Sequence, residues 1–129
     1  MKYYTSLFFL LIIATSFSCN EEKKEEEDIL PTGQISGQVK HHTDPVPNTI
    51  VYIKYGTIDL PGINPSDYDD QVTATGPDAY FEFMELKKGP YYIFGIGMDD
   101  DCSCEVIGGT PIILDSDSDI VESILPVTE

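Results

Sequence analysis

Short segments of β-forming residues, interrupted by turn-forming residues, constrain the fold of this chain more than any other feature. From Gly33 onward, runs rich in Val, Ile, Tyr and Phe alternate with clusters of Gly, Pro, Asn and Asp, and no long helical period is present. Turns at a spacing of about 10 residues are typical of a β-sandwich or a small barrel. We therefore predict an all-β fold, a Greek-key sandwich of seven strands. The strands are expected at residues 34–40, 49–56, 70–75, 79–84, 90–98, 110–114 and 119–127.

Alternation within these segments predicts which side chains face the core. Successive side chains on a strand point to opposite faces of the sheet. Burial of one large apolar side chain contributes roughly 1.5–3 kcal/mol, so about a dozen of them suffice for a domain of this size. The expected inward positions are Ile35, Gly37, Val39, Val51, Ile53, Tyr55, Phe81, Phe83, Leu86, Tyr91 and Ile93.

Four segments between the strands are interpreted as turns or loops. Residues 45–48 contain two prolines and an Asn, which favours a turn, and Gly89 makes residues 87–90 a tight connection. Residues 57–69 and 99–109 form longer loops, and loops on a rigid scaffold often carry ligand contacts. We expect any ligand to be contacted by these two loops.

The fifth expected strand carries apolar residues on both faces. Beside the inward Tyr91 and Ile93, its opposite face would present Tyr92, Phe94, Ile96 and Met98. A sandwich strand normally has polar residues there. The excess predicts an outer face that binds a partner; the alternatives are a shifted register or a cover formed by residues 99–109.

The strand sequences also match a family motif. It consists of Gly33-x-Ile35-x-Gly37-x-Val39, Pro47-Asn48-Thr49-x-Val51-x-Ile53 and Asp78-Ala79-Tyr80-Phe81-x-Phe83-x-x-Leu86-x-x-Gly89-x-Tyr91-x-Ile93. This pattern resembles the carboxypeptidase regulatory-like domain over residues 33–98, and residues 99–129 follow it in strand count alone. The resemblance implies a transthyretin-like (prealbumin-like) sandwich that serves as a non-catalytic accessory module. Ala79 stands where the family has Gly, and because Ala resists positive φ, we expect a different turn there.

The first residues of the chain resemble a bacterial lipoprotein signal. Lys2 precedes an apolar run at residues 7–17, which is too short to span a bilayer, and small residues lead to Cys19. The resemblance implies removal of residues 1–18 and lipidation of Cys19, which anchors the protein to a membrane. An ordinary secreted protein and an uncleaved anchor are the alternatives. The expected organisation is a signal at 1–18, a lipidated tether at 19–32 and one domain at 33–129.

The charge of the mature chain restricts its partners. Without Lys2, six lysines face 23 acids, a formal net charge of −17, and there is no arginine. Such a chain is repelled by phosphate backbones, so we expect no nucleic-acid partner. The charged run at residues 20–28 has no apolar face to bury and predicts a solvated tether. It also resembles an export tag of surface lipoproteins, which places the domain outside the outer membrane; a plain spacer is the alternative.

Two further cysteines, Cys102 and Cys104, are spaced as C-x-C. In an oxidising compartment they are expected to form a disulfide in a small, reducible ring. The alternatives are free thiols, intermolecular bonds, or a metal or redox role. The neighbouring Asp99–Asp101 and Glu105 should raise the thiol pKa and disfavour redox chemistry.

Histidine and aspartate residues offer weaker candidate metal sites. His41 and His42 are expected to be turn residues, because neighbours on a strand point to opposite faces and cannot easily share a metal. Residues 115–119 resemble half of a calcium loop, but Ile120 stands where an EF-hand needs Gly. A looser calcium site, the one cofactor considered, would use Asp67, Asp69, Asp70, Asp99, Asp100 and Asp101.

Together these observations predict a non-catalytic binding module at the cell surface, with a protein or a glycan as ligand. We find no serine elbow, metalloprotease helix or phosphate loop in the sequence. A calcium-stabilised adhesion or structural protein is the main alternative. A thiol enzyme that uses Cys102 or Cys104 with a histidine is another. The sequence does not decide the oligomeric state.

Overall fold

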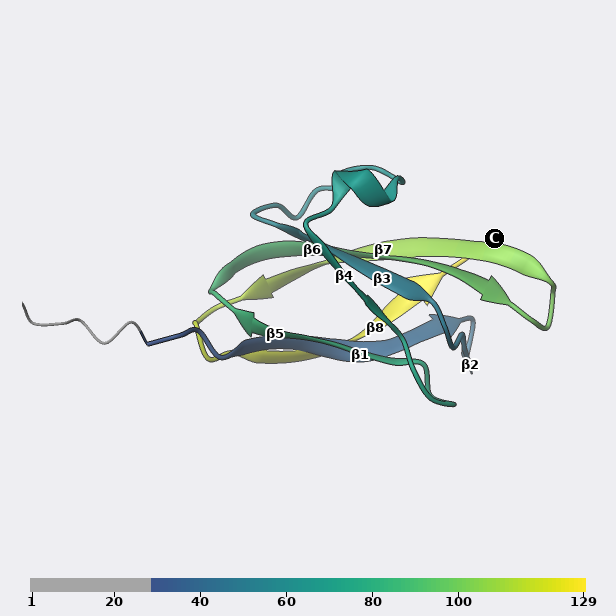
Figure 1. Cartoon of the computed structure of the whole chain (residues 1–129), viewed down its shortest axis with the longest axis horizontal. Helices are drawn as coiled ribbons and strands as arrows, with labels where there is room; N and C mark the ends of the chain where they lie inside the picture. Colours follow the sequence, from purple (N-terminus) through teal and green to yellow (C-terminus); the bar gives the residue numbers. More distant parts are fainter. Residues whose placement is uncertain (1–28) are drawn as a thin grey trace, which may run out of the picture.

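Two β-sheets pack face to face in the computed structural model, which describes residues 29–129 (Figure 1). Sheet A consists of β1 (Gly33–His41), β2 (Asp44–Pro45), β5 (Tyr80–Leu86) and β8 (Ile120–Val127). Sheet B consists of β3 (Ile50–Tyr55), β4 (Asp70–Thr73), β6 (Gly89–Asp99) and β7 (Cys104–Leu114). One short 3-10 helix, η1 (Pro65–Asp67), precedes β4. The predicted all-β sandwich is confirmed, with eight strands in the described residues rather than seven.

The additional strand in sheet A is β2, which forms a short hairpin with the end of β1. β5 pairs antiparallel with β1 along the same edge of β1 as β2. β8 pairs parallel with β1 along the other edge, from Gln34 opposite Ile120 to His41 opposite Val127. Gly37 permits this close pairing, because a Cβ there would overlap the carbonyl oxygen of Ser123.

Sheet B is antiparallel in the order β4-β3-β6-β7. The prediction of a long loop at residues 99–109 was wrong, because β6 and β7 form a long hairpin in which Asp99 pairs with Cys104. The predicted strand at 110–114 therefore begins at Cys104. Gly108 and Gly109 lie within β7, although glycine is uncommon in strands. A Cβ at Gly108 would overlap a backbone carbonyl of β8, and one at Gly109 would press on the Tyr92 ring.

The core lies between the sheets and contains most of the residues predicted to face inward. Ile35, Val39, Val51, Ile53 and Ile93 are fully buried, and the aromatic and leucine positions are nearly so. Tyr55 is the exception: its side chain lies at the end of β3 and is 46% exposed. β7 and β8 complete the core with Val106, Ile112, Leu114, Leu125 and Val127.

The turn before β5 differs from the prediction. Ala79 is buried and has φ +49, so it adopts the left-handed conformation that we expected it to avoid. Its backbone is held by hydrogen bonds, from Ala79 N–H to Gly76 O and from Val39 N–H to Ala79 O. Tertiary contacts therefore override the local preference of alanine at this position.

The predicted signal, Cys19 and the acidic run lie outside the described residues. Within residues 29–129, no helix has the length and apolar character needed to cross a membrane.

Candidate functional site

A groove of about 610 Å³ opens at one end of the sandwich, where β3 and β4 of sheet B approach the turn between β5 and β6. Its size lies in the range of small-molecule sites. The turn at residues 87–88, which links sheet A to sheet B, lies toward the left in Figure 1. The residues that give the groove its chemistry are Tyr55, Asp70, Met84, Glu85, Lys87, Lys88 and Tyr91.

Two tyrosines form the aromatic wall of the groove. The rings of Tyr55 and Tyr91 meet edge to face, with centroids 5.8 Å apart. Tyr91 donates its hydroxyl hydrogen to Lys87 O at 2.6 Å, and this bond holds the turn against β6. Burial raises the pKa of both phenols, and for Tyr55 the charge of Asp70 adds to this. Both rings therefore stay neutral at ordinary pH and offer an apolar surface with a hydroxyl group.

A β-bulge shapes the opposite wall. β5 has one more residue than β1 between the pairs Gly33–Leu86 and Ile35–Phe83, and Glu85 within this stretch has φ +58. A left-handed residue is typical of such bulges, which are common beside functional sites. The bulge directs Met84 to solvent, where it is 64% exposed.

Further hydrogen bonds fix the backbone around the groove. Lys88 N–H donates to Asp117 Oδ1 at 2.8 Å, and Tyr55 N–H donates to Asp69 Oδ2 at 2.8 Å. Asp69 also pairs with Lys54 at 3.3 Å. The groove is therefore formed by anchored segments, and a ligand would need little reordering of the chain to bind.

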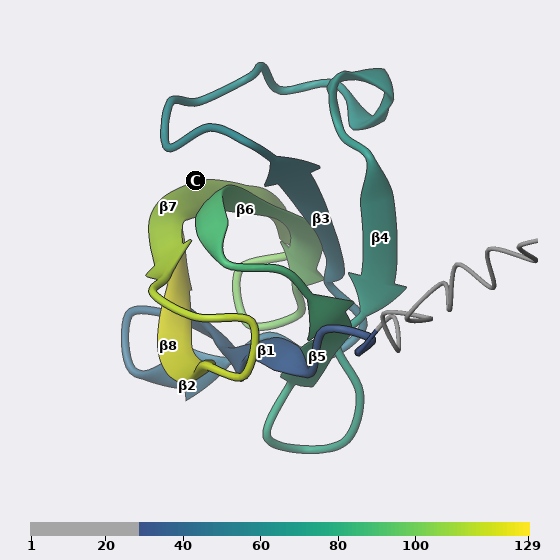
Figure 2. The ribbon, with the colours of Figure 1, turned by 90° about the vertical axis from the view of Figure 1, so that its left-hand side faces the viewer.

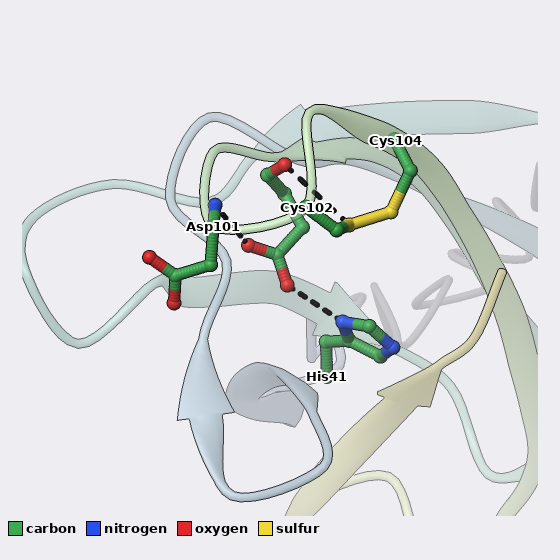
Figure 3. Close-up of a disulfide and its surroundings, with 5 residues drawn as sticks. His41, Asp101, Cys102 and Cys104 are labelled. Carbon is green, nitrogen blue, oxygen red and sulfur yellow. Dashed lines mark hydrogen bonds and ion pairs between the residues drawn. A yellow bond between two sulfur atoms is a disulfide. The ribbon is translucent and has the colours of Figure 1, made fainter.

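The C-x-C pair lies at the other end of β6. Cys102 and Cys104 are joined by a disulfide across the β6–β7 turn, and their Cα atoms are 5.2 Å apart. His41 lies beside it (Figure 3), and its Nδ1 is 2.6 Å from Asp99 Oδ2. The hydrogen bond with His41 lowers the pKa of Asp99, so this carboxyl is charged at neutral pH. Hence His41 is a buried strand residue, not the turn residue that we expected.

The fold has similar solved structures. The major pilin subunit BcpA of Bacillus cereus matches with a TM-score of 0.51 and 9% identity, over 76% of this chain and 30% of the pilin subunit. A Pseudomonas aeruginosa protein, proposed to bind carbohydrate, matches with a TM-score of 0.47 and 16% identity, over 75% of this chain and 89% of the other. No family model matches the sequence, and no curated protein matches it.

This chain has a β-sandwich fold like that of the pilin subunit. It spans less than a third of the pilin subunit's length, and at this identity the likeness extends to the fold alone.

The aspartates considered for calcium lie in two separate regions. Asp67 accepts a hydrogen bond from Asn64 N–H, Asp69 binds the end of β3, and Asp70 accepts one from Gln71 N–H. Within residues 29–129 these three carboxylates do not converge on a common point. Asp100 and Asp101 lie exposed in the β6–β7 turn. Asp99 does join a cluster of metal-ligating groups, but with His41 and Cys102.

The apolar outer face of β6 is covered in part by residues 56–69, which arch over sheet B (Figures 1 and 2). Tyr68 stacks on Phe94 with ring centroids 5.6 Å apart and also contacts Tyr52. Phe94 is thereby buried, so it belongs to a small second core and not to a partner surface. The register was predicted correctly, but the cover is residues 56–69 rather than 99–109. Tyr92 and Ile96 are half-buried, and Met98 is 54% exposed.

Two features of these sites were missed in the sequence. Tyr55 was placed in the core by strict alternation, although its position as the last residue of a strand leaves it at the edge of the sheet. His41 was predicted to be a turn residue, and its position beside the C-x-C pair was not predicted. The parallel pairing of β8 with β1, which places His41 opposite Val127, has no local sequence signal.

Proposed function

We propose that the chain is a non-catalytic binding module, anchored by lipid on the outer surface of the cell, whose ligand is a glycan held in the groove beside Tyr55. The observation that carries this proposal is the groove itself. It is preformed, has an aromatic wall and places lysine, glutamate and aspartate side chains around that wall. A sugar has apolar C–H faces that pack on an aromatic ring and hydroxyl groups that bond to such polar side chains.

The size of the groove favours a glycan over a protein. About 610 Å³ accommodates a short oligosaccharide. A stable protein interface needs roughly 800 Å² from each partner, usually over a broader surface. Two of the four lysines in residues 29–129 border the groove together with Asp70 and Glu85, so the groove offers both hydrogen-bond donors and acceptors to the hydroxyl groups of a sugar.

The module and its location are further parts of this proposal. The motif from Gly33 to Ile93 supports a carboxypeptidase regulatory-like sandwich, a family of accessory modules, although no family model matches. The apolar run before Cys19 and the acidic run after it support lipid anchoring and surface export.

A glycan array tests the proposal, using the full-length chain with Cys19→Ser, purified in mild detergent. We expect binding to a defined group of glycans, and we expect Tyr55→Ala to weaken it at least tenfold. The matched control is Tyr80→Ala, because Tyr80 is similarly exposed, at 40%, but lies outside the groove. Equal loss in both variants, or binding to immobilised proteins and to no glycan, would contradict the proposal.

A further inference from the structure

The end of the sandwich opposite the groove contains sulfur, nitrogen and oxygen ligands close together. One ring nitrogen of His41, one carboxylate oxygen of Asp99 and Cys102 Sγ all lie within 4.8 Å of one another. Cys102 Sγ, Cys104 Sγ and a carboxylate oxygen of Glu129 form a second group of the same size. Cys102 belongs to both groups, so its Sγ lies within 4.8 Å of ligand atoms from four other side chains, those of His41, Asp99, Cys104 and Glu129.

His41 is prepared for metal binding by its surroundings. Its side chain is only 7% exposed, and its Nδ1 is held by Asp99, which in turn accepts a hydrogen bond from Asp101 N–H at 2.9 Å. In metal-ligating histidines such a carboxylate partner holds the ring nitrogen that does not bind the metal and fixes the orientation of the ring, so Nε2 would be the ligand atom of His41. The neighbouring His42 differs from it, because it is exposed in the turn after β1.

The disulfide keeps the two sulfurs from acting as ligands. Reduction by a dithiol or a phosphine adds two electrons and two protons, which gives two thiols, while the reductant becomes a cyclic disulfide or a phosphine oxide. Cys102 is exposed, so a reductant can reach its sulfur, whereas Cys104 packs against the core. The cysteines remain neighbours after reduction, because the antiparallel pairing of β6 with β7 holds the turn that carries them.

We propose that reduction of the Cys102–Cys104 disulfide creates a binding site for a thiophilic divalent cation such as zinc, with Cys102, Cys104, His41 and Glu129 as ligands and Asp99 orienting His41. Two thiolates, an imidazole and a carboxylate make a set that zinc commonly accepts in tetrahedral geometry. Binding releases the two thiol protons, so the cation takes the place of the covalent cross-link.

The charges of this region favour a cation over thiol–disulfide exchange as its role. Asp99, Asp100, Asp101, Glu105 and Glu129 all lie on or beside the hairpin. Negative charges oppose the formation of a free thiolate, which a nucleophilic or redox cysteine requires. A divalent cation reverses that effect, since it compensates two thiolates and is itself attracted by the carboxylates.

Cobalt titration tests the proposal, because cobalt that is bound tetrahedrally by thiolates absorbs strongly in the visible range. Added zinc should displace the bound cobalt and remove this absorption. The sample is the full-length chain with Cys19→Ser in mild detergent, so that Cys102 and Cys104 are its remaining cysteines. It is reduced with a phosphine and handled without oxygen. We expect one cobalt per chain, the thiolate absorption bands, and at least 100-fold weaker binding to the same protein with its disulfide intact.

Single substitutions test the ligand set. His41→Gln should weaken cobalt binding at least tenfold. The matched control His42→Gln removes a ring that stacks on His41 but removes no ligand, so it should weaken binding much less. Cys104→Ser should abolish the absorption bands expected when two thiolates bind cobalt. This variant tests the ligand set even if His41→Gln fails to fold. The proposal is wrong if the reduced chain shows no thiolate bands, if the oxidised chain binds equally well, or if the two histidine variants behave alike. None of these outcomes depends on glycan binding.

Discussion

At the scale of single residues, the backbone conformation of Glu85 is strained, and this strain lowers the stability of the fold. Glu85 is exposed and has φ +58, and a left-handed conformation costs a non-glycine residue about 1–2 kcal/mol. We predict that Glu85→Gly raises the free energy of unfolding by about 0.5–1 kcal/mol, because the relief exceeds the entropy that glycine loses on folding. Glu122→Gly is the control: this exposed residue lies in the regular strand β8, so the change should lower stability instead. Denaturant unfolding of both variants measures the difference, and a loss in both would contradict the prediction.

Tyr68 gives a second prediction, on pH. Its hydroxyl donates to Gly62 O at 2.7 Å, and burial, assisted by Tyr92 and Asp67, raises its pKa from 10.0 to about 12. In the unfolded chain the phenol ionises near 10, so its contribution to stability is fully present below pH 10 and is lost as the pH rises toward 12. The stability advantage over Tyr68→Phe should therefore shrink across this range. Urea unfolding at a series of pH values measures it, and a difference that does not change with pH would refute it.

At the scale of elements, the pairing of β8 with β1 depends on Gly37. A Cβ at this position would overlap the carbonyl oxygen of Ser123, which is backbone and cannot rotate away. We predict that Gly37→Ala lowers the free energy of unfolding by about 3 kcal/mol, the upper part of the usual range for overpacking. Gln38→Ala, one position further along β1 and half-buried, should cost much less. Equal effects of the two changes in denaturant unfolding would show that β8 can shift to accept a side chain.

The same elements show how far sequence reasoning reaches. Strands with strong alternation, such as those around Ile35, Val51 and Ile93, were placed nearly correctly, because one buried face leaves a period of two in the sequence. β7 was predicted too short, since Gly108 and Gly109 look like loop residues, and their packing against β8 and Tyr92 is visible only in three dimensions. The cluster at His41 was missed for a related reason: it depends on pairing between distant segments.

At the scale of the whole molecule, the two candidate sites lie at opposite ends of β6. Tyr91 borders the groove and Asp99 supports His41, and eight residues of extended strand place them about 27 Å apart. β1 begins at Gly33, opposite Leu86 beside the groove, and ends at His41. A chain anchored through its N-terminal segment would therefore enter the domain at the groove end, and the disulfide would lie at the far end.

This arrangement leads to a prediction about intact cells. If the domain is anchored through Cys19 and exposed outside the outer membrane, the exposed Cys102 should be accessible to reagents that do not cross membranes. We expect a membrane-impermeant maleimide to label no cysteine before reduction and two per chain, Cys102 and Cys104, after treatment with an impermeant phosphine. Mass spectrometry of the labelled protein counts the adducts. The lipid thioether on Cys19 blocks the third sulfur, so three adducts would contradict the anchor. Labelling that requires disruption of the outer membrane would place the domain on the inner side of that membrane, where a surface glycan could not be its ligand.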